Sequence, residues 1–439
     1  MTSPDVHKFD VLVLGGGIGG LQAATDLADQ GFQVAVVERD PSIGGKMIRL
    51  SKVFPTLDCS SCITTPKMAS AAHHPNVTAF TYCEPNSVEK TAGGFTASIT
   101  QKPRYVIEDL CTGCGVCERE CPVYVPDEEQ GGMGARKAIR IPFSNAIPQL
   151  AVLDPENCTI CGKPTGKCMD VCPTYAIDYF QQPEVFIIEA ESVIVTTGYE
   201  LLLDYSQKAF GKVAEHPNLI TSMQMERLLA PHGPYMRVLR PGDGKEPEAV
   251  AFIQCAGSRD HTLGVPYCSR ICCMASIKQA MLLSGSLPLA DITIYYMDIR
   301  AFGKNYEQFF QNAKAMGVEF VKAKPLVAGS TEDGNLLIRY EDQEGGTGAV
   351  TREHDMVIQA LALIPAWDPK GTIDVETADD AFVKSVSPKL SPTLTTMDGV
   401  FTAGAATGPK DIVDTIVEAG AAAMEVSNYL TAARADAAE

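Results

Sequence analysis

The chain has 439 residues, of which 45% are hydrophobic and 21% charged, a composition typical of a folded globular protein with more than one domain. Its 54 acidic and 36 basic residues give a net charge of −18, which argues against nucleic acid and against an anionic membrane surface as partners. No apolar run predicts a direct membrane span and no signal-peptide pattern is present, so we expect a cytoplasmic protein whose 15 cysteines serve metal or redox chemistry rather than disulfides.

The first predicted unit is a strand, a glycine turn, a helix and a second strand over residues 9–40. Gly15, Gly17 and Gly20 follow the apolar strand Val11–Leu14 in the spacing G-x-G-x-x-G, and Glu38 ends the second strand. In this dinucleotide-binding fingerprint the glycines permit a tight turn and bring pyrophosphate to a helix N-terminus, while the acid binds a ribose hydroxyl. We therefore expect this turn to bind a dinucleotide.

Three later segments favour FAD over NAD. Residues 41–46, 192–198 and 395–404 resemble the corresponding segments of FAD-containing, disulfide-reductase-like flavoproteins. Beside the glycines and Glu38, the residues expected to contact FAD are Arg39, Gly44, Gly45, Lys46, Thr197, Gly198, Gly404, Lys410, Asp411 and Ile412.

Lys410 is a candidate for tuning the flavin. Either its ammonium group or the N–H groups of the helix that follows are expected to face the isoalloxazine ring, where positive charge would stabilise reduced flavin. The alternative is a solvated surface lysine.

Two cysteine runs predict a ferredoxin-like insert. They consist of Cys111, Cys114, Cys117 and Cys121, followed by proline, and of Cys158, Cys161, Cys168 and Cys172, also followed by proline. The first has the C-x2-C-x2-C-x3-C-P spacing of bacterial ferredoxins, in which the fourth cysteine of each run ligates the other cluster. The second has a longer gap before its third cysteine, Gly162–Lys167. We expect two [4Fe–4S] clusters, one held by the first three cysteines of run one with Cys172, the other by those of run two with Cys121.

Residues 245–365 predict a second Rossmann-like unit. Strands are expected at Ala249–Gln254 and Asp291–Asp298, with a helix at Ser269–Ser284 between them and a later strand at Met356–Ile364. The turn after the first strand lacks the glycine fingerprint, so direct oxidation of NAD(P)H is not expected.

Four cysteines replace those glycines: Cys255, Cys268, Cys272 and Cys273. A helix from Ser269 would place Cys268 and Cys272 on one face, with Cys255 arriving from the strand end. This arrangement predicts a third [4Fe–4S] cluster at a helix N-terminus. The alternative is four buried free cysteines.

The long motifs around these cysteines resemble the A-type subunit of heterodisulfide reductase. They are FIQCAGSRD and YCSRICCMASIKQA around the third cysteine set, PTLDCSSCITTPKM at residues 55–68, and GAATGPKDIVDTIVEAGAAA at residues 404–423. The resemblance extends from Asp10 to about Leu430 and implies a thioredoxin-reductase-like FAD core, an inserted two-cluster ferredoxin and one further cluster. It also implies electron exchange with partner subunits of the B and C types or other electron-transfer proteins, with a homodimer as a candidate assembly. The chain begins at the FAD strand and shows no ferredoxin pattern after residue 430, so we expect a shorter form of the subunit.

The expected fold is therefore α/β, in four parts. Residues 1–103, 181–244 and 366–430 would form the FAD-binding domain, 104–180 the inserted ferredoxin, 245–365 the second Rossmann-like domain and 431–439 a frayed tail. The expected function is that of an iron–sulfur flavoprotein that relays electrons in a heterodisulfide-reductase-like complex. The alternatives are a free-standing disulfide or sulfur reductase that depends on ferredoxin or NAD(P)H, and an FAD and iron–sulfur scaffold without turnover.

Cys59 and Cys62 form a C-x-x-C pair with no proposed iron. The resemblance places the pair near the flavin, where it could be a catalytic redox dithiol. It could instead supply ligands to the third cluster or be a buried inert pair. Cys83 is expected in the core.

Overall fold

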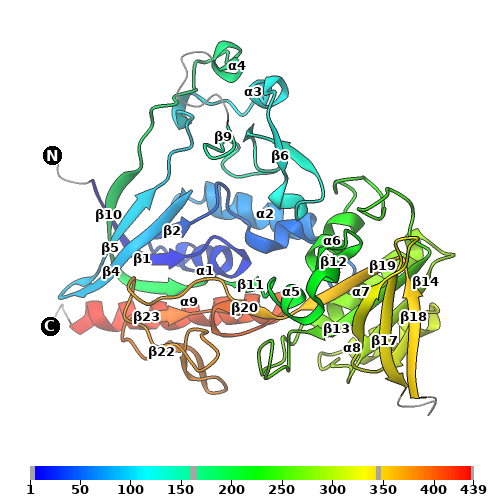
Figure 1. Ribbon diagram of the computed structural model, residues 1–439. Coiled ribbons are helices and arrows are strands. Elements are labelled where there is room, and N and C mark those ends of the chain that lie inside the picture. Colours follow the sequence, from blue (N-terminus) through cyan, green and yellow to red (C-terminus); the bar gives the residue numbers. More distant parts are fainter. Residues whose placement is uncertain (1–4, 159–165, 343–347, 437–439) are drawn as a thin grey trace.

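The computed structural model describes residues 5–158, 166–342 and 348–436, and Figure 1 shows their arrangement. The first of two large sheets has nine strands, in the order β21-β22-β23-β10-β1-β2-β3, with β5 paired to β10 and β4 paired to β5. The parallel strands are β1 (Val6–Leu14), β2 (Val34–Glu38), β3 (Val77–Thr81), β10 (Glu184–Val195) and β23 (Val400–Thr402). The remaining strands are β4 (Cys83–Thr91), β5 (Gly94–Gln101), β21 (Ser385–Ser387) and β22 (Ser391–Thr395).

Three helices accompany this sheet: α1 (Ile18–Ala28), α2 (Ser60–His73) and α9 (Ile412–Asp436). The apolar run Val11–Leu14 lies at the centre of the sheet between β10 and β2, and none of its residues is more than 2% exposed. Since α1 follows β1 after only a short turn, the predicted strand–turn–helix–strand unit is confirmed.

The insert leaves the sheet after β5 and returns at β10. Gln101 and Glu184 are antiparallel partners, so the two ends of the insert lie side by side and the sheet continues past it. Figure 1 shows the insert standing off one side of the first sheet. Arg104 marks the junction, because it is 2% exposed and its guanidinium donates to Thr81 at 2.5 Å and to Glu108 at 2.8 Å. The short elements of the insert are α3 (Val116–Glu120), β6 (Tyr124–Pro126), β7 (Ala135–Lys137), β8 (Ile139–Arg140), β9 (Val152–Leu153) and α4 (Lys167–Asp170).

The second sheet is parallel, in the order β12-β19-β13-β14-β15. Its strands are β12 (Leu219–Thr221), β13 (Ala249–Ala256), β14 (Asp291–Tyr296), β15 (Glu319–Lys322) and β19 (Met356–Leu361). One face packs against α6 (Ser222–Leu229), α7 (Cys272–Ser286) and α8 (Tyr306–Ala315). The other packs against the antiparallel sheet of β16 (Leu326–Ser330), β17 (Leu336–Asp342) and β18 (Gly348–His354). Two short strands, β11 (Tyr199–Leu201) and β20 (Leu363–Pro365), pair between the two sheets.

Three expectations from the sequence differ from the structure. The helix after β13 begins at Cys272 rather than Ser269, because Arg270 has a left-handed backbone (φ 56°) that a right-handed helix cannot include. Residues 219–229 pair and pack with the second sheet, so the boundary expected at residue 244 is wrong. The expected tail is helical through Asp436, held by Arg434, which pairs with Glu191 at 2.8 Å and with Asp10. Residues 437–439 lie outside the described part of the chain.

Over the described ranges, no helix combines the length and the hydrophobicity needed to cross a membrane.

Candidate functional site

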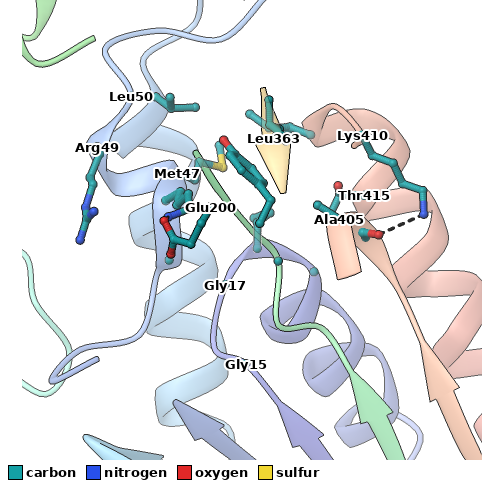
Figure 2. Close-up of a pocket in the computed structure, with 18 of the residues that line it drawn as sticks. Gly15, Gly17, Met47, Arg49, Leu50, Glu200, Leu363, Ala405, Lys410 and Thr415 are labelled. Carbon is teal, nitrogen blue, oxygen red and sulfur yellow. Dashed lines mark hydrogen bonds and ion pairs between the residues drawn. The ribbon is translucent and has the colours of Figure 1, made fainter. Parts of the chain in front are cut away.

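One large cavity, of about 600 Å³, opens where the carboxyl end of β1 meets the second sheet. Figure 2 shows its floor at Gly15 and Gly17 and its two sides at Met47 and at Ala405. Most residues expected to contact FAD line it: Gly15, Gly17, Glu38, Arg39, Gly45, Lys46, Thr197, Gly198, Gly404, Lys410, Asp411 and Ile412. Gly20 and Gly44 are not among the residues that line it.

The three glycines of the fingerprint differ in their surroundings. A Cβ at Gly20 would lie 1.9 Å from the Gly15 carbonyl oxygen, and one at Gly15 would lie 2.6 Å from the Thr196 carbonyl oxygen. Both positions therefore require glycine for the fold itself. Gly17 is the N-cap of α1, and a Cβ there would meet nothing closer than Gly45 Cα at 4.0 Å. Gly17 thus leaves open the space at the helix N-terminus that a pyrophosphate would occupy.

Glu38 closes the far end of this turn. Its carboxylate accepts hydrogen bonds from the Gly16 N–H at 2.7 Å and the Asp40 N–H at 2.9 Å. Burial raises the pKa of Glu38 to about 7. An acceptor fixed at the end of β2 fits the ribose of a dinucleotide, so the cavity fits FAD on the geometry of this chain.

Two cations share one acid on the cavity wall. Glu200 pairs with Lys46 at 2.6 Å and with Arg39 at 2.5 Å. Burial lowers the pKa of Lys46, and the Lys46 ammonium lies 5.6 Å from the centre of the Tyr199 ring. The group keeps an excess of positive charge beside the glycine turn, which favours an anionic ligand.

Lys410 lines the cavity, but its ammonium group is already bonded. It donates to the Gly404 carbonyl at 3.0 Å, marked by the dashed line in Figure 2, to Glu418 at 2.7 Å and to Thr407. The side chain is 12% exposed, so the alternative of a solvated surface lysine is wrong. Lys410 holds the loop that begins at Gly404, and its contact with flavin stays a prediction.

A buried ion pair at the other end of the cavity is not evident from the sequence. Lys278 of α7 and Glu226 of α6 both line the cavity, are 2–3% exposed and pair with each other. Lys278 also donates to the Lys52 carbonyl at 2.8 Å, and Glu226 accepts from the Ser51 N–H at 3.0 Å. The pair therefore joins the second sheet to the flavin-side loop. One feature of the sequence could have indicated the pair: Lys278 is the only charged residue of α7.

The ferredoxin cysteines converge as the spacing predicts. Cys111, Cys114, Cys117 and Cys172 line one small pocket, which is the ligand set expected for the first cluster. In the second set, Cys168 is close enough to Cys121 and Cys158 to interact with both, and its Sγ lies 2.9 Å from the Tyr179 hydroxyl. Cys161 lies outside the described residues. Burial raises the pKa of Cys117 to about 12, so ligation of a cluster there would release a proton.

The third cysteine set also comes together, although not in the predicted way. Cys255 is the penultimate residue of β13, Cys268 lies in the following loop, and Cys272 and Cys273 open α7. Cys268 and Cys272 therefore do not share a helix face, yet each of the four thiols interacts electrostatically with others of the set. Cys272 also lines the flavin cavity. Burial raises the pKa of Cys273 to about 11.

Among the residues that the structure describes, no three His, Cys, Asp or Glu side chains are arranged to share a single metal ion. A cubane has a different requirement, because each thiolate binds a different iron of a larger body. In the first pocket four cysteines line a common space, and around α7 the four thiols are electrostatic neighbours.

The remaining cysteines separate into two kinds. Cys83 is 1% exposed in the core, as expected, and burial raises its pKa to about 12. Cys62 is exposed and Cys59 partly exposed, so the alternative of a buried inert pair is wrong.

Comparison with known protein families identifies an FAD-binding region and an iron–sulfur region in the chain. Residues 10–57 match the family model of FAD dependent oxidoreductases, and residues 110–177 match the 4Fe-4S dicluster domain. The chain thus contains an FAD-binding and a 4Fe–4S region.

Two methanogen proteins are similar to nearly the whole chain. The A-type iron-sulfur subunit of CoB–CoM heterodisulfide reductase from Methanocaldococcus jannaschii is 44% identical over 95% of this chain. The A-type subunit of H2:CoB-CoM heterodisulfide,ferredoxin reductase from Methanothermobacter marburgensis is 43% identical over 95% of it. The chain spans 63% of the length of each.

Solved structures show the fold alone. Thioredoxin reductase of T. acidophilum superposes with a TM-score of 0.54 at 16% identity, covering 97% of this chain and 99% of that one. A Cu(II) complex of a cysteine variant of the flavoprotein disulfide reductase RclA from Escherichia coli gives 0.50 at 10% identity, covering 96% and 71%. The expected thioredoxin-reductase-like α/β fold is confirmed.

Proposed function

We propose, from homology to the A-type subunit of heterodisulfide reductase over 95% of the chain, that this protein is an FAD and iron–sulfur electron-transfer subunit of such a complex. It would relay electrons between flavin, [4Fe–4S] clusters and partner subunits in disulfide, sulfur or anaerobic energy metabolism. Because the chain spans 63% of those relatives, its activity, substrate and partners are all part of the proposal.

The observation that carries the proposal is the composition of the cavity wall. Gly17 of the dinucleotide turn and Cys272 of the third cysteine set line the same cavity. FAD, when bound, exchanges two electrons, whereas iron–sulfur clusters exchange one at a time. A cluster at Cys272 would therefore adjoin the flavin with no intervening layer of protein.

Different residues along this cavity would bind the cofactor and position the third cysteine set. Gly17 and Glu38 would hold the pyrophosphate and the ribose, and Lys46 would add positive charge beside them. At the opposite end, the Lys278–Glu226 pair fixes α7, and with it Cys272, against the flavin-side loop. Cys255 and Cys273 are buried, so two of the four thiols are kept away from water.

The proposed inventory is one FAD and three [4Fe–4S] clusters. The pocket lined by Cys111, Cys114, Cys117 and Cys172 supports cross-ligation between the two ferredoxin runs. The mutual interactions of the four cysteines around α7 support a third cluster.

A free-standing NAD(P)H-dependent reductase fits the second sheet less well. In a nicotinamide site the helix follows the first strand after a short glycine turn. Here residues 257–271 separate β13 from α7, and the helix opens on cysteines.

Rapid-mixing spectroscopy of the anaerobic holoprotein tests the proposal. Reduced ferredoxin should bleach the flavin of the wild-type protein, NADH should not, and Cys273→Ala should slow the bleaching about tenfold or more while FAD content is kept. Ser286→Ala, an exposed position at the far end of α7, is the control and should behave as wild type. Bleaching by NADH at a comparable rate would favour the free-standing reductase. A flavin that no low-potential donor reduces would favour the scaffold.

The partners belong to the same proposal. We expect subunits of the B and C types or other electron-transfer proteins to co-purify with the native protein, with a homodimer of this chain as a candidate assembly. A cytoplasmic location agrees with the use of so many cysteines for metal rather than disulfides.

A further inference from the structure

Cys59 and Cys62 form a second sulfur site outside the clusters. Cys59 is the N-cap of α2 and Cys62 lies in its first turn. The Cys62 N–H donates to the Cys59 Sγ at 3.3 Å, and the two side chains are also hydrogen-bonded to each other. Both thiols are free, and their side chains are in hydrogen-bonding contact, as the formation of a disulfide between them requires.

The two sulfurs are not equivalent. The hydrogen bond from the Cys62 side chain lowers the pKa of Cys59, and the backbone N–H groups of Cys62 and Ser61 and the charge of Lys52 act in the same direction. The same contact raises the pKa of Cys62. Cys59 is thus the more acidic thiol of the pair and Cys62 the less acidic one, the division found in redox dithiols that open a helix.

The surroundings distinguish this pair from the other cysteines. The electrostatic interactions among thiols at α7 are those of Cys255, Cys268, Cys272 and Cys273 with one another, and the thiol partner of Cys59 is Cys62. Cys62 is exposed to solvent, whereas Cys83 is sealed in the core. A solvent-borne molecule can therefore reach Cys62 and its neighbour.

The pair lies on the outer side of the loop that walls the flavin cavity. Cys59 forms a β-bridge with Lys52, and the Ser60 hydroxyl donates to the Met47 carbonyl at 2.5 Å. Met47 and Lys52 both line the cavity. The dithiol is thus joined to the loop that lines the flavin cavity, although neither cysteine lines the cavity itself.

We propose that Cys59 and Cys62 are a redox-active dithiol that exchanges with an external disulfide. The Cys59 thiolate attacks one sulfur of the disulfide R–S–S–R, forming a mixed disulfide and releasing RS⁻. The Cys62 thiol loses its proton and attacks the Cys59 sulfur, releasing the second RS⁻. Two thiolates and one Cys59–Cys62 disulfide result, and the two electrons that reduce R–S–S–R come from the pair itself. The exchange needs neither the clusters nor the proposed electron relay.

Differential alkylation with peptide mass spectrometry tests this on the anaerobic holoprotein. In a graded series of oxidised and reduced dithiothreitol, the peptide carrying Cys59 and Cys62 should pass reversibly from doubly alkylated to internally disulfide-bonded. With glutathione disulfide as probe, Cys62→Ser, which keeps a side-chain donor beside Cys59, should accumulate a glutathione adduct on Cys59. Cys59→Ala should form its adduct on Cys62 at least about tenfold more slowly.

Iron content and the flavin spectrum distinguish the outcomes. Both variants should retain the iron and FAD of the wild type, so a failure of the electron relay leaves this test unaffected. Loss of iron from Cys59→Ala would overturn the proposal in favour of cluster ligation. A pair that stays doubly alkylated over the whole dithiothreitol series, or equal reactivity of the two single variants, would also overturn it.

Discussion

The two large sheets use the same topological position, the turn after a parallel strand, in different ways. In the first, β1 ends at Leu14 and α1 begins at Ile18, so only a glycine turn separates strand from helix. In the second, β13 ends at Ala256 and α7 begins at Cys272, and the intervening loop carries Cys268. Ligands commonly bind at the carboxyl edge of a parallel sheet, and the residues of the turn decide which ligand that edge suits.

The two turns also differ in what fixes them. Backbone geometry fixes the first, because side chains at Gly15 or Gly20 would collide with main-chain oxygens. Side-chain hydrogen bonds fix the second: the Ser269 hydroxyl lies 2.7 Å from that of Ser258 and accepts from the Leu363 N–H at 2.9 Å. Both turns face one cavity, which is what would make a flavin and a cluster neighbours.

The largest expected effect is at Gly17. Gly17→Val should fold, because a Cβ there meets open space, but the side chain should occupy the proposed pyrophosphate site. We expect FAD content to fall about tenfold or more while iron content is unchanged, measured by absorbance and iron analysis of the purified protein.

Gly20→Val is the paired control for that substitution. Its Cβ would lie 1.9 Å from the Gly15 carbonyl oxygen, so we expect loss of folded protein rather than selective loss of FAD. A Gly17→Val protein with full FAD would show that the glycine turn of the first sheet is not the nucleotide site.

The next effect concerns the contact between the two units. Lys278→Met leaves the Glu226 carboxylate buried without its cation, and we expect the free energy of unfolding to fall by about 3–5 kcal/mol. The double variant Lys278→Met, Glu226→Gln should recover part of that loss in chemical denaturation. A single variant as stable as wild type would mean that the pair does not join the sheets.

The smallest expected effect is on the pH dependence of folding stability, to which one buried group in each unit contributes with opposite sign. The pKa of Glu38 is raised to about 7, so its contribution to stability falls as pH rises from 4.5 towards 7. The pKa of His354 is lowered to about 4, so its contribution is complete above pH 6.5 and is lost as pH falls towards 4.

Melting temperatures between pH 4.5 and 6.5 separate these contributions. Relative to wild type, Glu38→Gln should gain stability as pH rises and His354→Gln should gain it as pH falls, each by up to about 1.4 kcal/mol per pH unit. Parallel curves for the two variants would contradict the assigned burial of both groups.

The sequence predicted the parts of this molecule that depend on local spacing. The glycine turn and the two ferredoxin runs are short patterns whose geometry follows from the backbone, and the described ligand pocket contains the expected Cys172 from the second run. The start of α7 could not be predicted, since the left-handed Arg270 and the bonds of Ser269 are set by tertiary contacts. The Lys278–Glu226 pair depends on helices that are distant in the chain, so no spacing rule identifies it.

The central claim is that cysteines at α7 hold a cluster where the first sheet uses glycines. Iron and FAD analysis of the anaerobically purified holoprotein, wild type against Cys273→Ala, tests it most directly. We expect about twelve irons and one FAD per chain in the wild type, and about eight irons with FAD retained in the variant. A wild-type protein with about eight irons, or a variant that keeps all of its iron, would contradict the claim.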